Sequence, residues 1–297
     1  MKRALWAISL ASASAACSHA ATMPATTLSL RPACADTQFF DPPSGACKPR
    51  GSAAAQIDAG ATALAAFDVD TARKSLDAAE IAGPLTHTEN VRLWEQRGIA
   101  AAYVDDEPTA RAAFDMMLAL DPGHFLSYRL SPKATFVFDD MRAAHRVAPS
   151  IELDLPRGQK VGDPLPIDLA VVADPKAFLK RGTLFVRTRG DATWRAADLA
   201  LVAGTDRRVE LPPVIATKPT SVELYLRAYD DKGNEVLAYA DPEHPREIPL
   251  RYEPPTPFYK KWWVITIAAG VVATATGLIV YEATLAPPDK VNGGVTQ

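Results

Sequence analysis

The sequence predicts a multidomain α + β protein: an array of short helices, then an antiparallel β-sandwich, then one C-terminal transmembrane helix. Alanine is frequent over residues 52–119, whereas proline becomes frequent after residue 149, which indicates helices followed by strands. Between residues 151 and 252, apolar and polar side chains alternate, as in strands that bury one face. Residues 262–281 contain no charged side chain, which is typical of a membrane-spanning helix.

Changes in composition set the expected boundaries within the 297 residues, a length suited to about two folded domains. Helix-breaking residues at 83–84 and 121–123 predict where two of the helices end. The expected order is a signal peptide (1–20), a flexible segment (21–51), a helical domain (52–148), a β-sandwich (149–252), a Pro-rich linker (253–261), a transmembrane helix (262–281) and a short tail (282–297).

Residues 1–20 have the order of a secretory signal peptide, with basic residues first, then an apolar run, then small residues. Two processing sites compete within it. Residues 14–17, Ser-Ala-Ala-Cys, resemble a lipoprotein box, which would make Cys17 the lipidated residue. Residues 18–20, Ser-His-Ala, instead offer a cleavage site after Ala20, and the sequence leaves both open.

The sequence contains three cysteines, and two of them, Cys34 and Cys47, bracket a segment rich in turn residues. A disulfide between these two would close a loop of about 14 residues and contribute roughly 3 kcal/mol through the lost entropy of the unfolded chain. The pairing is expected if the protein is exported. The alternative is two unpaired thiols in a flexible segment.

The stretch 262–281 is 20 residues long. At roughly 1.5 Å per residue a helix of that length spans the hydrocarbon core of a bilayer. Tryptophans at one end and Tyr281 at the other stand where aromatic belts form. With the signal peptide, this predicts a single-pass protein of a cell-envelope membrane whose larger part is periplasmic. Two lysines before the span favour the opposite orientation by the positive-inside rule, and a buried core helix is the soluble alternative.

Small residues in this span, Ala269, Ala273 and Gly277, are spaced four apart and so share one face of a helix. Such a face lets two helices approach closely in a membrane, which predicts a helix–helix contact and a homo-oligomer. The alternative is a span that is simply rich in alanine.

Residues 91–124 resemble a tetratricopeptide repeat, a 34-residue helical hairpin. The resemblance depends on small residues where two helices would touch, an aromatic residue that would fill the crevice, and a proline after the second helix: Trp94, Gly98, Ala110, Phe114 and Pro122. Residues 53–86 match more weakly, and residues 131–146 would form a capping helix. The alternative is an unrelated alanine-rich bundle.

The repeat resemblance implies a concave surface lined by the first helix of each hairpin. In the better match the implied partner-binding residues are Arg92, Glu95, Ile99 and Tyr103. The same side chains could instead pack against the capping helix or be solvated.

Alternation over residues 165–171, 184–187 and 222–229 predicts strands, with a turn at 230–234. Residues 224–234, Leu-Tyr-Leu-Arg-Ala-Tyr-Asp-Asp-Lys-Gly-Asn, resemble the late hairpin of immunoglobulin-like or fibronectin type III-like bacterial domains. That resemblance implies a sandwich of about seven strands that acts as a spacer or an adhesion module.

No motif in the sequence indicates catalysis. A net charge of −3 and a pI near 6.0 provide no basic field for nucleic acid. The histidines and cysteines lack metal-ligand spacing, and no phosphate-binding loop or nucleophile motif is present. We therefore expect no enzyme activity, no cofactor, no metal and no nucleic-acid partner.

The function expected from the sequence is that of a membrane-anchored envelope adaptor, with membrane lipid and a protein or peptide as its partners. The partner would bind the tetratricopeptide-like helices, a layout that resembles membrane proteins of Gram-negative envelope machineries. Two alternatives stay open: a structural or adhesion protein whose β-sandwich is the interaction surface, and a non-catalytic subunit of an envelope complex.

Overall fold

The computed structural model describes residues 25–127, 129–144, 147–204 and 206–254, together with residues 260–263, 266–267, 271, 274–276 and 279–280. The chain divides into two compact units, Met1–Arg251 and Tyr252–Gln297, which are described separately. The first unit contains five described helices and twelve described strands.

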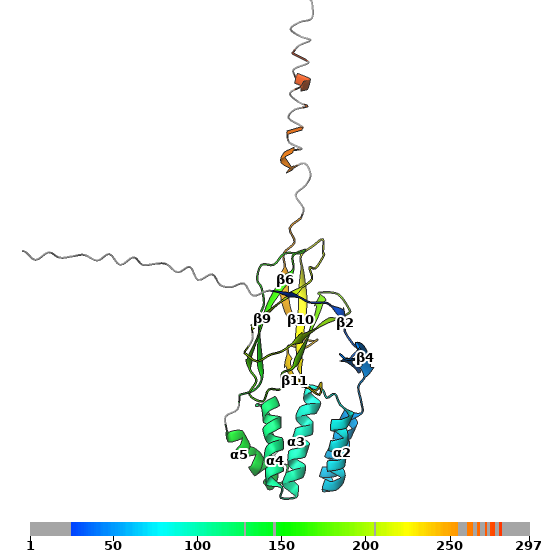
Figure 1. Ribbon diagram of the computed structural model, residues 1–297, viewed down its shortest axis with the longest axis vertical. Helices are drawn as coiled ribbons and strands as arrows, with labels where there is room; N and C mark the ends of the chain where they lie inside the picture. The colour runs from blue at the N-terminus through cyan, green and yellow to red at the C-terminus, as the bar shows by residue number, and fades with distance from the viewer. Residues whose placement is uncertain are drawn as a thin grey trace, which may run out of the picture. The chain divides into compact units, whose positions relative to one another are not determined.

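The helices of the first unit form two antiparallel hairpins and one further helix (Figure 1). Polar side chains define where three of them begin: Asp68 accepts from Thr71 N, Asp106 accepts from Thr109 N, and Thr86 forms a capping box with Glu89. The helices are α1 (Ala53–Ala65), α2 (Val69–Ala82), α3 (His87–Tyr103), α4 (Glu107–Leu120) and α5 (Pro132–Ala143).

Each helical hairpin depends on a glycine where its two helices touch. A Cβ added to Gly98 of α3 would lie 2.4 Å from the Phe114 ring of α4, and one added to Gly60 of α1 would lie 2.9 Å from Leu76 of α2. Phe114 is fully buried and meets Phe138 of α5 edge to face, with ring centroids 5.6 Å apart. The hairpins are therefore close-packed around side chains, with no room for a methyl group at either glycine.

The eight later strands form most of two packed sheets. In the first sheet the order is β1-β9-β6-β5, and in the second it is β11-β10-β7-β8-β2, with β12 also pairing with β10. These strands are β5 (Ser150–Asp154), β6 (Leu165–Ala173), β7 (Arg181–Thr188), β8 (Arg195–Ala200), β9 (Asp206–Leu211), β10 (Thr220–Tyr229), β11 (Glu235–Tyr239) and β12 (Arg246–Leu250).

The segment before the helices also belongs to this sandwich. Strand β1 (Thr26–Thr27) pairs in parallel with β9, and β2 (Arg31–Pro32) pairs antiparallel with β8. Strands β3 (Gln38–Asp41) and β4 (Ala46–Pro49) form a hairpin of their own. The helices are therefore an insertion between the first strands of the sandwich and the remaining ones.

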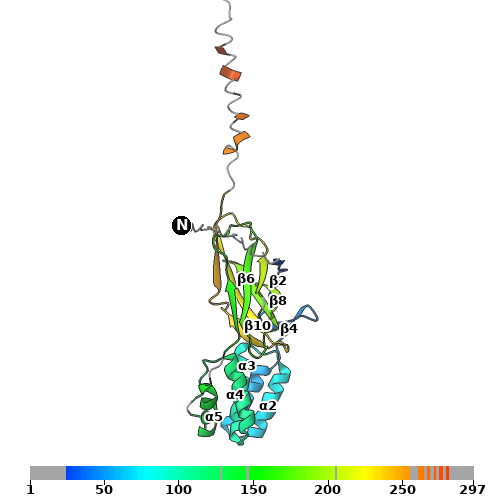
Figure 2. The same cartoon turned by 60° about the vertical axis from the view of Figure 1, so that its left-hand side comes forward.

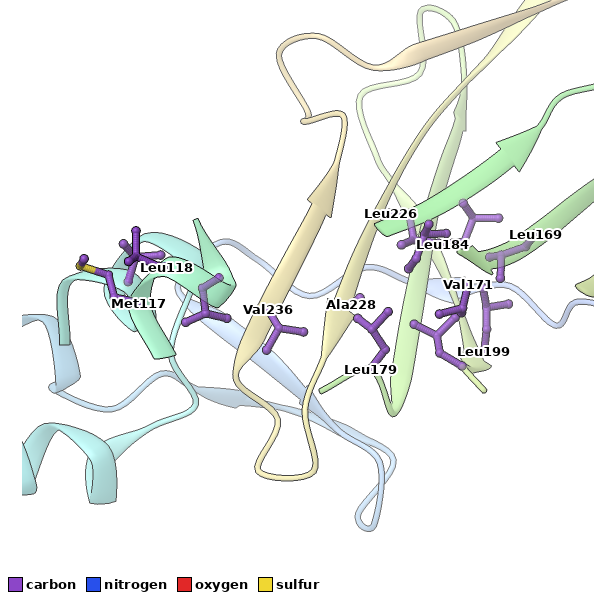
Figure 3. Close-up of a cluster of buried hydrophobic side chains, with 14 of the residues drawn as sticks. Met117, Leu118, Leu169, Val171, Leu179, Leu184, Leu199, Leu226, Ala228 and Val236 are labelled. Atoms are coloured by element: carbon purple, nitrogen blue, oxygen red, sulfur yellow. The ribbon is translucent and has the colours of Figure 1, made fainter. Parts of the chain in front are cut away.

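The core runs from the sandwich into the helices. Alternation along β7 and β10 turns Leu184 and Leu226 toward Leu169 and Val171 of the facing sheet (Figure 3). The same buried cluster continues through Val236 of β11 to side chains of α4, including Met117 and Leu118. The sandwich and the helices thus share a hydrophobic core, and a second, smaller cluster lies between α1, α2 and the start of α3.

Hydrogen bonds tie the start of α3 to the β10–β11 turn. Glu235 N donates to Leu85 O at 2.9 Å, and Leu85 N donates to the Asn234 side chain at 3.0 Å. Asn90 of α3 donates to Glu235 O at 3.3 Å. Asn90, Asn234 and Glu235 are all buried, so these bonds satisfy groups that have lost contact with water.

The predicted fold class, a tetratricopeptide-like array followed by an immunoglobulin-like sandwich and a transmembrane helix, is wrong. Strands β1 and β2 precede the helices and complete the two sheets, so no separate helical array comes before the sandwich. The spacing of Gly98 and Phe114 is what any close antiparallel helix pair requires, and it is not specific to the repeat. The sheets are sandwich-like, but their likeness to an immunoglobulin domain is loose.

The predicted transmembrane helix is also corrected. Among the described residues, no helix is both long and apolar enough to cross a membrane. This finding overturns the predicted single-pass location in a cell-envelope membrane. The signal peptide (1–20) and the tail (282–297) lie outside the described residues.

Candidate functional site

The outer face of the six-stranded sheet carries a cluster of aromatic side chains. Phe185 of β7 and Tyr225 of β10 are register partners, and their rings stack with centroids 4.5 Å apart and planes 6° from parallel. Trp194, just before β8, meets Tyr225 edge to face at 4.8 Å. These rings alternate with the core residues of the same strands, so they point away from the facing sheet.

A cleft of about 750 Å³ opens over this aromatic cluster. Phe185, Tyr225 and Tyr229 lie on its sheet side, the β3–β4 hairpin forms a wall, and residues 84–88 at the start of α3 line one end. Figure 2 shows the hairpin projecting beside the sandwich, near the helices. The cleft therefore depends on four segments that are far apart in the sequence.

Several contacts hold the hairpin wall in place. Cys34 and Cys47 form a disulfide with Cα atoms 5.6 Å apart. Arg31 stacks over the Phe40 ring at 3.4 Å and also donates to Asp198 of β8 at 3.0 Å. These contacts join the hairpin to the edge of the six-stranded sheet, so the wall does not rest on the two-residue pairing of β2 alone.

Several charged side chains of the cleft already have a partner of opposite charge. Arg227 lies 2.5 Å from Glu235, and Lys232 lies 2.7 Å from Glu80. Asp41 pairs with Lys48 of the same hairpin, which lowers the pKa of its carboxyl group. These ion pairs hold the paired side chains in position, and little uncompensated charge remains on them.

Two arginines of the cleft are different. Arg181 lies over the Tyr229 ring, with the guanidinium carbon 5.1 Å from the ring centroid, and Arg50 donates only a long bond of 3.5 Å to Pro84 O. Among the described residues, the buried Nε atoms of both arginines and the buried Nδ1 atom of His87 have no hydrogen-bond partner. A native protein leaves few buried polar atoms unpaired, which draws attention to this end of the cleft.

The tyrosines of the cleft stay protonated at any ordinary pH. Burial raises the pKa of Tyr229 to about 12, against the opposing effect of Arg50, Arg181 and Arg227. Burial also raises the pKa of Tyr225. The Tyr229 hydroxyl is therefore a neutral donor, and the Arg181 guanidinium lies over its ring.

The partner-binding residues predicted on α3 do not line this cleft. Arg92 pairs with Asp58 of α1 at 2.6 Å, and Glu95 lies 3.3 Å from His124. Ile99 is 2% exposed, and Tyr103 stacks on Phe67 with centroids 5.7 Å apart. The structure thus uses these four side chains for contacts within the helical region, and their role in binding a partner stays a prediction.

The remaining predicted site residues fall into two groups. Cys34 and Cys47 are joined, as described above. Cys17, Ala269, Ala273 and Gly277 lie outside the described residues. Across the part of the chain that is described, no group of three or more His, Cys, Asp or Glu side chains is placed to hold a metal ion.

Sequence reasoning missed the cleft because its residues come from four separate segments. One local pattern did point to it: residues 225–229 read Tyr-Leu-Arg-Ala-Tyr, which places aromatic and basic side chains on the outer face of a strand. A solvated outer face would carry smaller or more acidic side chains. The partners across the cleft, Arg50 and Arg181, have no such local pattern.

No family model matches the chain, and no curated protein matches it. The tetratricopeptide resemblance therefore has no support from a family comparison. Among the solved structures that match is the cohesin module of a family 33 glycoside hydrolase from Clostridium perfringens, at 12% identity and a TM-score of 0.23. The match covers 35% of this chain and 98% of that chain. A TM-score this low supports no inference about fold or function.

Proposed function

We propose that this chain is a binding protein that holds an extended segment of a partner protein in the cleft on the outer face of its six-stranded sheet. The observation that supports this proposal is the stacked pair of Phe185 and Tyr225, which lies at the base of an open cleft on the face of the sheet opposite the core. The proposal takes the sandwich, and not the helices, as the interaction surface.

The cleft has the size and the chemistry for a short peptide. Its volume of about 750 Å³ lies within the range of sites that enclose a ligand of several residues. Stacked rings offer a flat apolar surface at low entropic cost, and arginine and tyrosine side chains add directed hydrogen bonds. Rings and arginines are the residue types in which binding energy concentrates at protein interfaces.

We propose no reaction for this cleft. Among the described side chains that line it, those with buried, unpaired polar atoms are two arginines and a histidine, which favour recognition of a ligand over attack on it. A non-catalytic role is thus the proposal that these groups support.

Selection of random 12-residue peptides displayed on phage, with the intact protein as target, tests this function. Enriched peptides, made synthetically, should bind by calorimetry, and Phe185→Ala should weaken them at least about tenfold. Phe40→Ser, on the hairpin wall, gives a second variant that does not alter the sheet. Melting curves show whether either variant is folded.

The matched control is the double variant Arg92→Ala, Tyr103→Ala on α3, which should change the affinity by less than about twofold. The proposal fails if no peptide is enriched. It also fails if the α3 variant abolishes binding while Phe185→Ala and Phe40→Ser leave it intact, because the helices would then be the binding surface.

A further inference from the structure

We infer that the end of the cleft next to α3 is a carboxylate-binding subsite, formed by Arg50, Arg181 and the Tyr229 hydroxyl, that takes an acidic side chain of the bound peptide. This inference rests on the proposed function, because it names the chemistry of the ligand that the cleft holds.

The register of the sheet brings Arg181 and Tyr229 together. Tyr229 of β10 and Arg181 of β7 are direct partners across the antiparallel pair, so both side chains leave the sheet on its outer face. Arg50 arrives from a different direction, since it follows the last residue of β4 and contacts Pro84 just before α3. Both guanidinium charges act on the Tyr229 hydroxyl, where they oppose the effect of burial on its pKa.

Arg227 provides an internal comparison. It lies on the same face, two residues before Tyr229, but its charge is neutralised by the buried carboxylate of Glu235 at 2.5 Å. Among the residues that the structure describes, Arg50 and Arg181 have no carboxylate in contact, and the Nε atom of each is buried without an acceptor. Partly buried charges of this kind are costly alone and gain most from a partner of opposite charge.

The unpaired donors fit a planar carboxylate. Guanidinium groups bind carboxylates through paired hydrogen bonds, and a neutral tyrosine hydroxyl can donate a further bond to the same oxygen. His87, at the first position of α3, lines the same end of the cleft with its Nδ1 atom unpaired. The partial positive charge at the beginning of this 17-residue helix adds a smaller favourable contribution.

The surrounding acids select a single negative charge. Asp230 and Asp231 line the same cleft, so a ligand with two charges on one group would be repelled more strongly than a carboxylate. A phosphorylated side chain is therefore a poorer ligand here than glutamate or aspartate.

Arginine side-chain NMR tests the subsite on the intact protein. The Nε–Hε resonances of Arg50 and Arg181, assigned with Arg50→Gln and Arg181→Gln, should shift saturably when succinate is added. The resonance of Arg189, an exposed arginine at the end of β7 that pairs with Glu247, should stay unchanged. Sodium chloride at equal ionic strength should move none of the three. Equal or larger shifts with inorganic phosphate would overturn the choice of a carboxylate.

Peptide affinities separate this inference from the proposed function. Changing each Glu or Asp of an enriched peptide to Gln or Asn should weaken binding to the unmodified protein at least about tenfold. In the double variant Arg50→Gln, Arg181→Gln the same change should alter the peptide affinity less than about twofold. The reason is that the peptide carboxylates and the two arginines contribute to affinity by binding each other. The variant Arg189→Gln should behave as the unmodified protein.

If acidic and amide peptides bind equally well, and Phe185→Ala still weakens both, the subsite is refuted while the peptide-binding cleft stands. If neither peptide responds to Phe185→Ala or Phe40→Ser, the cleft itself is refuted.

Discussion

The helical region and the outer face of the six-stranded sheet use the same residue types in opposite ways. In the helices, the rings of Phe114 and Phe138 are buried against each other. On the sheet, Phe185 and Tyr225 stack at the base of an open cleft. The first pair fills the core, whereas the second pair lies on the opposite face of its sheet, where Tyr225 is 7% exposed and Phe185 is half-buried.

Charges differ in the same way. Arginines of the helices reach carboxylates on neighbouring helices: Arg92 pairs with Asp58, and Arg97 pairs with Asp77 and Glu80. Arg50 and Arg181 of the cleft lack such partners among the described residues. Because internally neutralised side chains gain little from a ligand, the comparison favours the cleft as the binding surface.

The largest effect is expected when the hairpin wall loses its disulfide. The double variant Cys34→Ser, Cys47→Ser removes a crosslink over a sequence separation of 13 residues. The free energy of unfolding should fall by about 3 kcal/mol, because the unfolded chain gains entropy. Urea denaturation measures this, and the unmodified protein under reducing conditions should give the same midpoint. A variant that unfolds at the original urea concentration would mean that the disulfide contributes nothing to stability.

The next effect concerns packing of the helices. Gly98→Ala would bring a methyl group against the buried Phe114 ring, and overpacking of this kind costs about 1–3 kcal/mol. Gly123→Ala is the matched control, since its nearest contact is 3.4 Å away, on a side-chain oxygen. Thermal denaturation should separate the two. Peptide affinity should be the same in both variants, and a selective loss in Gly98→Ala would implicate the helices in binding.

The smallest effect is a dependence of stability on pH in the helical region. Glu95, with Asp121, raises the pKa of His124 above its usual value near 6.5. A raised pKa stabilises the folded state below the unfolded value, and this contribution is lost as pH rises through the folded pKa. The protein should therefore be more stable at pH 6 than at pH 8 by up to about 1 kcal/mol from this group. Glu95→Gln should remove that difference, and an unchanged pH profile would disprove the assignment.

Local patterns predicted several elements of the fold. Alternation over residues 222–229 and the turn residues 230–234 predicted a strand followed by a turn, and the structure has β10 at Thr220–Tyr229 and pairs it with β11 at Glu235–Tyr239. The helix breakers at 83–84 and 121–123 likewise marked the ends of α2 and α4. These elements were predictable because the features that define them lie within a few residues of one another.

The long-range features were not predictable in this way. Strands β1 and β2 are two residues long, too short for any periodic pattern, and they pair with strands more than a hundred residues away. The cleft likewise depends on the meeting of Arg50, Arg181 and Tyr229, which only the register of β7 and β10 and the path of the hairpin bring about. Helix packing at Gly98 suggested a repeat because close contact and repeat architecture share the same small residue.

The most direct test of the account places a bound peptide relative to the two regions. Tyrosines labelled with carbon-13 in their rings report on both, since Tyr225 and Tyr229 lie in the cleft and Tyr103 lies on α3. A peptide from the phage selection, carrying a nitroxide spin label, should broaden the ring signals of Tyr225 and Tyr229 and leave Tyr103 sharp. Broadening of Tyr103 with unchanged Tyr225 and Tyr229 signals would contradict the account and place the partner on the helices.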